Sequence, residues 1–302
     1  MTGYILSRLI RAAVTMLLTV TIVFLFIRFS GDPAAALVPP DAPQEVIDQY
    51  ARTMGLDQPI WRQYAGYIGG ILRGDFGFSI HTGLAVEEVF FDRLPFTLHL
   101  GLTALALAIA IGIPIGAIAA IRRGSALDRF VMGFSVFAFA MPNFLFGLIL
   151  ILTAALAFGT FLGGDSANVI WPALTLGLAA MGSFARFARS SLLETINAPY
   201  MRAAEARGVP FWTRLIRHAA PNAAIPLVTL IGLSLGALVA GSVVTEQVFA
   251  WPGVGQLLVR SVATRDLAQV QFLVLVVAFT MVMANLVVDF LYLLIDPRIR
   301  AT

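Results

Sequence analysis

One motif in this sequence could support nucleophilic catalysis: Gly232-Leu233-Ser234-Leu235-Gly236 matches the G-x-S-x-G pattern of a hydrolase nucleophile elbow. That elbow works on a strained turn between a strand and a helix, beside a histidine base. Here the serine lies inside a long apolar stretch, and the nearest histidine in sequence, His218, belongs to a polar segment before it. The pattern therefore favours a packing line of small residues. An intramembrane hydrolase stays as an alternative, and Ser234→Ala would test it.

Other catalytic chemistry is excluded by residues that the chain lacks. It has no cysteine and no lysine, so thiolate nucleophiles, Cys-ligated metals and the P-loop motif G-x-x-x-x-G-K-[ST] are all ruled out. His81 and His99 have no metal-ligand spacing. We therefore expect no catalytic residue, no metal site and no nucleotide hydrolysis in this chain.

The composition indicates a membrane protein. Hydrophobic residues make up 59% of the chain and charged residues 12%, about half the charged share of a globular domain, which is about 25%. A helix needs roughly 20 mostly apolar residues to cross a bilayer. The fold class predicted is an all-α integral membrane protein with six transmembrane helices. The six stretches are Leu9–Phe29, Leu98–Ile121, Phe130–Phe158, Val169–Ala188, Ala223–Val244 and Gln271–Ile295.

The distribution of arginine predicts the orientation. If the N-terminus is cytoplasmic, 13 of the 20 arginines fall on that side and 6 on the other, with Arg28 at the end of the first span. By the positive-inside rule, both termini are then cytoplasmic. A cleavable signal peptide is the alternative for the first span, but its apolar run is longer than the usual core of about 7–15 residues.

The predicted spans contain few ionisable residues that could couple transport to an ion. Asp289 is the one carboxylate within them, and a proton- or sodium-driven carrier usually buries carboxylates or histidines near the membrane midplane. Ion-coupled transport is therefore disfavoured, and the energy for transport is expected to come from elsewhere. An autonomous channel or ion-coupled carrier stays as the alternative.

The segment between the first two spans is predicted to form external helices. Asp41-Ala42-Pro43 resembles a helix start and Gly55 a stop, which predicts a helix over Gln44–Met54. A second helix is expected after Asp57-Gln58-Pro59, with one apolar face that begins at Ile60. These helices form either a cap over the spans or a docking surface for another protein.

A cytoplasmic hairpin is predicted between Arg186 and Asn222, a stretch with six arginines. Pro199 starts a first short helix and Gly208 supplies its left-handed stop. Pro210 restarts the chain, and Pro221-Asn222 is expected to end the second helix. The alternative is a basic loop whose arginines only set the membrane orientation and whose helical pattern is accidental.

Small residues recur every four positions in two spans. They are Ala104, Ala108, Gly112, Gly116 and Ala120 in the second span, and Gly232, Gly236 and Ala240 in the fifth. Such lines let helices pack closely. Both packing within this chain and packing against a second subunit remain open, and Pro114 and Pro142 predict kinks.

The hairpin sequence resembles the EAA loop of ABC importer permeases. The Ala203-Ala204 pair, Gly208 and His218-Ala219-Ala220-Pro221-Asn222 carry this resemblance. Further motifs narrow it to the first permease subunit of the dipeptide/oligopeptide/nickel family: Gly31-Asp32-Pro33, Gly55-Leu56-Asp57-Gln58-Pro59, Gly74-Asp75-Phe76-Gly77-Phe78-Ser79, Glu246 to Gly255, Asn285 to Asp289, and Asp296-Pro297-Arg298. One departure is Arg202, which stands where the motif has glutamate.

The resemblance implies the type-1 importer permease fold and a set of candidate sites. The residues implied in coupling to an ATPase are Ala203, Ala204, Glu205, Arg207, Gly208, His218, Pro221 and Asn222. The residues implied in contacts with an external binding protein or in a gate are Glu246, Phe249, Trp251, Pro252, Gly253 and Gly255. The implied division is an N-terminal helix with an external segment (1–95), a transmembrane domain (96–296, with the coupling loop at about 193–222) and a cytoplasmic tail (297–302).

The resemblance also implies the function and the partners. The expected function is import of di- or oligopeptides across the bacterial inner membrane by alternating access, with nickel chelate, glutathione or oligosaccharide as alternative cargo. The partners implied are a second permease, two ATP-binding subunits or domains, and an extracytoplasmic substrate-binding protein. ATP and magnesium would be bound by the ATPase partners, and this chain itself would bind no cofactor.

Overall fold

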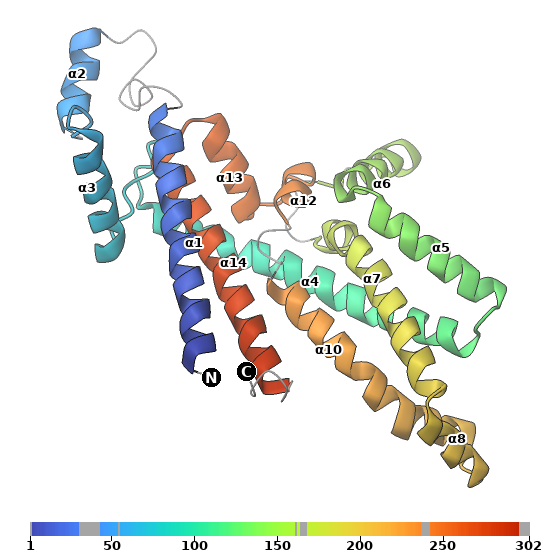
Figure 1. Ribbon diagram of the computed structural model, residues 1–302. Helices are drawn as coiled ribbons and strands as arrows, with labels where there is room; N and C mark the ends of the chain where they lie inside the picture. The colour runs from blue at the N-terminus through green and yellow to red at the C-terminus, as the bar shows by residue number, and fades with distance from the viewer. Residues whose placement is uncertain are drawn as a thin grey trace. The chain divides into compact units, whose positions relative to one another are not determined.

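The structure, a computed structural model, describes residues 2–29, 43–53, 55–160, 162–163, 168–236 and 242–295 (Figure 1). The regular elements in these ranges are helices, so the predicted all-α class is confirmed for the described part of the chain. The helices are α1 Thr2–Phe29, α2 Gln44–Thr53, α3 Ile60–Arg73, α4 Val86–Ile121, α5 Ala126–Ala140, α6 Asn143–Phe158, α7 Ile170–Ile196, α8 Pro199–Ala206, α9 Phe211–Arg214, the π-helix η2 Leu215–Ala219, α10 Ala220–Gly236, α12 Val243–Val248, α13 Val254–Ala263 and α14 Leu267–Ile295. The motif Gly31-Asp32-Pro33 and the predicted tail 297–302 lie outside the described residues.

The number of clear membrane spans is smaller than predicted. Among the described residues, Leu6–Phe29 and Val86–Ile121 are long and apolar enough to cross a membrane. A third span exists if α5 and α6, which are bent by 101° at their junction, are counted as one. The predicted count of six is therefore not confirmed. The fifth predicted span also runs through residues 237–241, which the structure does not describe.

The predicted third span, Phe130–Phe158, is two helices and not one. Met141 leaves the helical region with φ −76° and ψ 124°, and α6 begins after Pro142. Proline disfavours a helical conformation in the residue before it and has no N–H for the helix ladder. Pro142 was expected to kink the span, and its effect is a full break.

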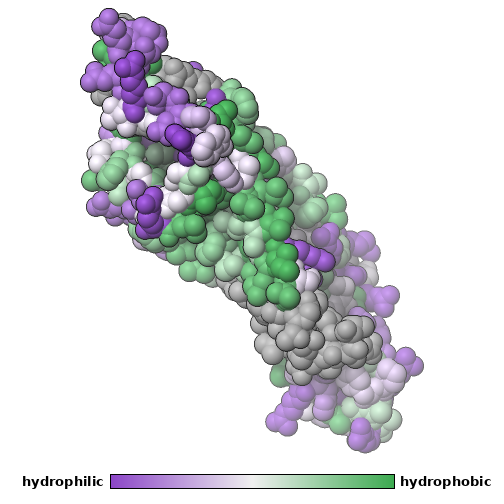
Figure 2. All heavy atoms as spheres, turned by 60° about the vertical axis from the view of Figure 1, so that its left-hand side comes forward, coloured by the Kyte–Doolittle hydropathy of each residue, from purple (hydrophilic) through white to green (hydrophobic). Residues whose placement is uncertain are grey.

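The chain divides into two compact units, Met1–Pro95 with Gln256–Thr302, and Phe96–Gly255. In the first unit, α1 packs along α14 (Figure 1). The helices α2 and α3 are confirmed close to their predicted bounds. Tyr64 joins α3 to α1, because its hydroxyl lies 2.7 Å from Thr21 Oγ1 and its ring meets Phe24 edge to face. Figure 2 shows hydrophobic side chains gathered along α1 and hydrophilic ones at α2.

In the second unit, α7 packs against both α5 and α10. The small-residue line of α4 faces α7, and all five of its members are buried. A Cβ added to Gly112 would lie 2.6 Å from the carbonyl oxygen of Met181, and one added to Gly116 would clash with the backbone of Ala185. The sequence left open whether this line packs within the chain or against a second subunit. For α4, it packs within the chain.

Candidate functional site

The hairpin (residues 197–222) begins as the sequence predicts. Pro199 is the first residue of α8, and Gly208 follows that helix with φ +77°, the left-handed conformation that glycine adopts at low cost. Pro210 precedes α9. Pro199 and Gly208 thus define the start and the end of α8, and Pro210 defines the start of α9.

The predicted end of the second helix at Pro221-Asn222 is wrong. The chain continues from α9 through the π-helix η2 into α10, and both residues lie in the first turn of α10. An α-helical proline at 221 would lack a donor and would collide with the carbonyl four residues earlier. The wider π turn directly before it relieves that clash, which explains why the helix does not end there.

The inner face of the hairpin is part of the core. Met201 and Ala204 from α8 pack with Leu215 and Ala219 from η2. The same cluster includes Ala120 at the end of α4, Leu192 of α7 and Ala223 of α10. The Ser191 hydroxyl also donates to the Ala223 carbonyl, 2.9 Å away. The hairpin is therefore fixed to the ends of three long helices.

The outer face of the hairpin carries most of the predicted coupling residues. The exposed ones are Ala203, Glu205, Arg207, Gly208, His218, Pro221 and Asn222. Ala204 differs, because only 6% of it is exposed. It therefore contributes to internal packing and not to a surface contact in this conformation.

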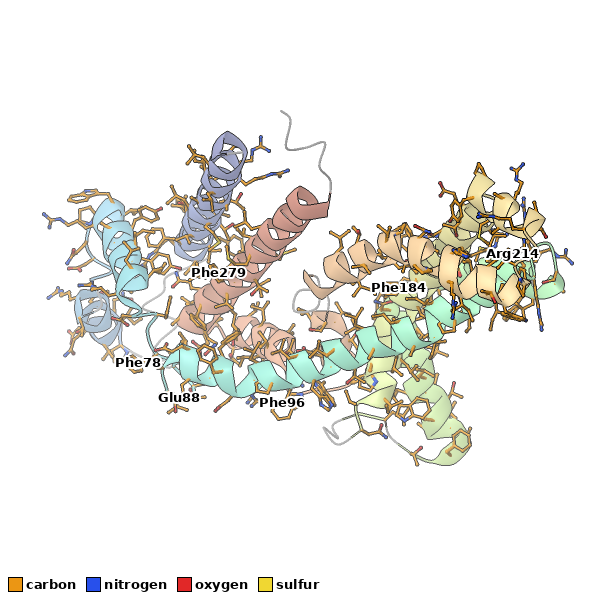
Figure 3. All side chains as sticks on the ribbon, turned by 90° about the horizontal axis from the view of Figure 1, so that it is seen from below. Phe78, Glu88, Phe96, Phe184, Arg214 and Phe279 are labelled. Atoms are coloured by element: carbon orange, nitrogen blue, oxygen red, sulfur yellow. The ribbon has the colours of Figure 1, made fainter. Side chains whose placement is uncertain are left out.

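An ion pair holds the two arms of the hairpin together. Arg214 Nη2 donates to Glu205 Oε1 at 2.9 Å (Figure 3). This hydrogen bond, together with the charge of the guanidinium, holds the pKa of Glu205 below its usual value. Arg202, which replaces the motif acid, makes a long contact of 3.4 Å from Nη2 to the Asn197 carbonyl.

Sequence reasoning missed three apolar side chains on the outer face. Phe211, Trp212 and Ile216 are 41%, 63% and 64% exposed. Two aromatic residues directly after Pro210, in a stretch rich in arginine, were the available signal, because a solvated loop rarely needs them. An exposed apolar cluster with a polar rim is typical of a protein interaction site.

The second set of predicted site residues, Glu246 to Gly255, forms a buried structure. Glu246 is fully buried, and its Oε1 accepts from Thr97 Oγ1 at 2.7 Å and from Ser242 Oγ at 2.8 Å. A Cβ on Gly253 would lie 2.5 Å from the Glu246 carboxylate. The absence of a side chain at Gly253 thus lets the backbone close over this carboxylate.

Trp251 anchors the same segment. Its indole Nε1 donates to the Phe96 carbonyl at 2.9 Å, and its ring packs in a core cluster with Leu100 and Ala173. Phe249 is 2% exposed, Gly255 is buried and Pro252 is partly buried. These residues stabilise the segment by internal packing. Val244, Gln247 and Ala250 are exposed, so a partner could contact the chain at these positions.

Thr97→Val is expected to lower the free energy of unfolding by about 2–4 kcal/mol. The Thr97 hydroxyl donates to Glu246 and accepts from the Val254 N–H at 2.8 Å. Valine would remove one of the hydrogen bonds to the buried Glu246 carboxylate and would leave the Val254 N–H without this acceptor. Thermal melting of the detergent-purified protein measures this effect. Thr19→Val is the matched control, because the Thr19 hydroxyl donates to the Thr15 carbonyl of its own helix. Equal melting temperatures of the two variants would contradict a stabilising role of the Thr97 hydrogen bonds.

The serine of the G-x-S-x-G motif is not placed on a turn between a strand and a helix. Ser234 lies within α10, and its hydroxyl donates to the Leu230 carbonyl of the same helix at 2.8 Å. His81 lies beside the Thr264 carbonyl, and the His99 ring lies near Trp251. Among the described residues, no cluster of three His, Asp or Glu side chains could hold a metal ion.

Two family models together match nearly the whole chain. Residues 112–301 match the binding-protein-dependent transport system inner membrane component, and residues 1–101 match the N-terminal region of such membrane components. The glutathione transport system permease protein GsiC of Escherichia coli K12 is 38% identical over 304 residues, and the alignment covers 99% of each chain. GsiC of Salmonella typhimurium is 40% identical with the same coverage.

Proposed function

The chain belongs to the family of inner-membrane components of binding-protein-dependent transport systems, and we propose that it imports short peptides. It is the permease subunit of an ABC importer and a multi-pass protein of the bacterial inner membrane. The relatives are named for transport of glutathione, which is a tripeptide, and this supports a short peptide as the cargo. A nickel chelate or an oligosaccharide remains an alternative cargo of the same architecture.

One observation supports the coupling role most strongly: the hairpin has two faces with different surroundings. Its inner face packs on the ends of α4, α7 and α10, and its outer face presents Phe211, Trp212 and Ile216 to solvent. A partner that binds the outer face can move three long helices as one body, because packed interfaces move rigidly. Binding shifts the conformation only if the partner binds one state more tightly than the other. An ATPase whose cleft closes on ATP meets that condition.

The complete importer is proposed to contain further subunits. A second, similar permease would complete the path, two ATP-binding subunits or domains would hold ATP and magnesium, and an external binding protein would deliver the cargo. Both termini of this chain are proposed to be cytoplasmic, with α7, α10 and α14 completing six spans. The division into 1–95, 96–296 and 297–302 remains a prediction.

The outer segments, 31–96 and 245–270, are proposed to receive the loaded binding protein. Within them, α3 exposes Trp61 (65%) and Leu72 (81%). The buried carboxylate of Glu246 and the Trp251 anchor would keep the 246–255 segment in one shape, which a docking platform requires.

Competition in proteoliposomes tests the proposed cargo. The assembled importer, with ATP inside the vesicles and loaded binding protein outside, is supplied with a labelled tripeptide. Unlabelled di-, tri- and tetrapeptides are expected to reduce uptake, and unlabelled oligosaccharide and nickel–histidine complex are expected to have no effect. Uptake that only the oligosaccharide or the nickel complex reduces would contradict a peptide cargo.

Tryptophan substitutions at two adjacent positions of α8 are expected to have different effects, one on docking to the ATPase and the other on folding. Ala203 is exposed and Ala204 is 6% exposed on the same helix. Ala203→Trp should leave the amount of membrane-inserted chain unchanged and reduce ATP-driven uptake about tenfold, since it places bulk in the docking face. Ala204→Trp should reduce the amount of folded chain, because it overfills the hairpin core. Immunoblots of membranes and initial uptake rates measure both effects. Normal uptake by Ala203→Trp would argue against docking at this face.

A further inference from the structure

We propose that a cavity between α4, α5 and α7 binds one acyl chain of an anionic phospholipid, whose headgroup phosphate is held by Arg122, Arg123 and Arg129. The proposal rests on the proposed function only for the side of the membrane, which would be the cytoplasmic leaflet. The residues involved all lie within Phe96–Gly255, the second unit.

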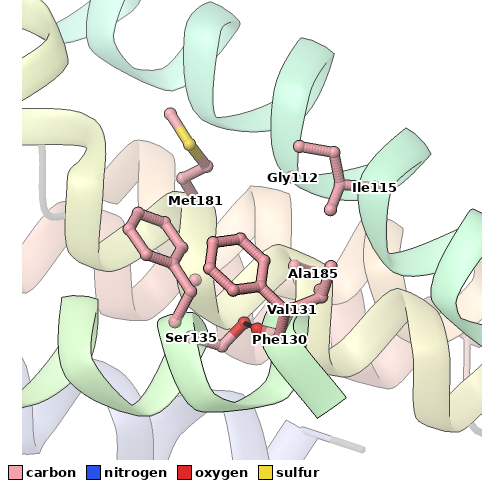
Figure 4. A pocket seen from close by; sticks show the side chains of 9 residues that line it. Gly112, Ile115, Phe130, Val131, Ser135, Met181 and Ala185 are labelled. Atoms are coloured by element: carbon pink, nitrogen blue, oxygen red, sulfur yellow. Dashed lines mark hydrogen bonds between the residues drawn. The ribbon is translucent and has the colours of Figure 1, made fainter. Parts of the chain in front are cut away.

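The cavity has the size and lining of an apolar ligand site. Its volume is about 300 Å³, and it is lined by Gly112, Ile115, Phe130, Val131, Phe134, Ser135, Met181, Gly182 and Ala185 (Figure 4). Gly112 and Gly182 contribute backbone to this lining, because a Cβ on either would lie less than 3 Å from a carbonyl oxygen of a neighbouring helix, that of Met181 or Ser135. This volume lies at the lower end of the range for small-ligand sites.

The one side-chain hydroxyl in this lining is already satisfied. Ser135 Oγ donates to the Val131 carbonyl of its own helix at 2.7 Å. The cavity therefore offers an occupant no unpaired polar side chain among these lining residues, and an apolar space of this kind does not hold ordered water. The chemistry favours a hydrocarbon occupant.

The cavity is accessible from the surface of the chain. Phe130 and Phe134 are 72% and 40% exposed, and Ile115 on the facing helix is 38% exposed. In a membrane protein these side chains face either lipid or another subunit. A lipid chain could enter between α4 and α5 without unfolding of either helix.

The connection between α4 and α5, together with the first turn of α5, supplies positive charge at one end of this cavity. Arg129 Nη1 in that turn donates to the Gly124 carbonyl at 2.9 Å. Arg122, Arg123 and Arg129 are all exposed, and Arg129 directly precedes the lining residue Phe130. Ile115 precedes Arg122 by about two helical turns, or roughly 10 Å along α4. A phosphate held by the arginines would therefore leave its acyl chain at the depth of the cavity.

Asp128, in the first turn of α5, pairs mainly with Arg189 of α7, and the charge of Arg123 also acts on it. Asp128 is 4% exposed, and Arg189 of α7 donates to both of its oxygens, at 2.5 Å from Nε and 2.8 Å from Nη2. Gly124 N–H donates to the same carboxylate at 2.9 Å. The segment thus keeps an excess of positive charge next to an apolar space, which matches the two parts of an anionic lipid and not those of a zwitterionic one.

Native mass spectrometry of the complete importer tests this proposal. The importer is released from vesicles with equal amounts of phosphatidylglycerol and phosphatidylethanolamine. We expect one retained phosphatidylglycerol per chain, in at least tenfold excess over phosphatidylethanolamine. R122Q/R123Q/R129Q should lose the preference, whereas the equal charge change R52Q/R62Q/R73Q on α2 and α3 should keep it.

A cavity-filling variant tests the acyl-chain part separately. Ile115→Trp should lose the bound lipid, and Ile118→Trp, at an exposed position on the same helix outside the cavity lining, should retain it. Benzoylphenylalanine in place of Ile115 should crosslink to lipid in the intact importer. The same lipid count in all variants would overturn the proposal, and so would crosslinking to a protein subunit or displacement of the lipid by millimolar inorganic phosphate. The lipid count needs neither ATP nor cargo, so it fails or succeeds independently of transport.

Discussion

Replacement of both Trp212 and Ile216 with alanine is expected to abolish ATP-driven uptake while the chain still reaches the membrane in normal amounts. Both side chains are more than 60% exposed in the described structure, so their truncation removes little internal packing. If they enter an ATPase cleft, they become central apolar anchors, and tryptophan is among the most frequent hot-spot residues of interfaces. Their joint loss should cost about 3 kcal/mol of docking free energy, which weakens binding about 100-fold.

The measurements for this prediction are copurification of the ATPase subunits and ATP-driven uptake in vesicles. Trp61→Ala is the matched control for the aromatic truncation, since Trp61 is 65% exposed on α3 in the other unit. The control should retain the ATPase subunits. Full copurification and normal uptake in the double variant would show that the exposed cluster is not the docking surface.

Gly116→Leu is expected to prevent stable folding of the second unit. Even a Cβ at this position would collide with the carbonyl and Cα of Ala185, which are backbone atoms and cannot rotate away. The α4 and α7 helices would have to separate, and with them the packing around Phe184, which is 1% exposed between α4, α7 and α10 (Figure 3). Helices in membranes associate through such close packing, so its loss has no compensating hydrophobic gain.

Membrane-inserted chain per cell and its melting temperature in detergent measure this effect. Gly133→Leu provides the control, because a Cβ at Gly133 of α5 would lie more than 4 Å from the atoms of the other described segments. We expect little or no folded Gly116→Leu chain and normal amounts of Gly133→Leu. Equal yields and melting temperatures would mean that α4 and α7 are not in close contact.

Local signals in the sequence predicted local structure well. Pro199, Gly208 and Pro210 set helix ends through their own backbone restrictions, and α8 and α9 follow them. The helices α2 and α3 were found from start and stop residues in the same way. Such signals act within a few residues, so they need no knowledge of the rest of the chain.

Features that depend on tertiary packing were not predictable in this way. The π turn before Pro221 lets a helix continue where a proline alone predicts an end. The resemblance implied that Glu246 contacts a binding protein or forms part of a gate, but Glu246 is buried and accepts a hydrogen bond from Thr97, about 150 positions earlier in the sequence. Which of two adjacent alanines in α8 is buried depends on η2, whose place beside α8 no sequence pattern indicates.

The account depends on one claim: this chain moves cargo only when an ATPase acts on its hairpin. The most direct measurement is solute accumulation in two kinds of proteoliposome, one with the complete importer and one with this chain alone. With loaded binding protein outside, the complete importer should concentrate labelled peptide only when ATP and magnesium are present on the side of the hairpin. The chain alone should accumulate none. Accumulation by the chain alone, or by the complete importer without ATP, would contradict the account.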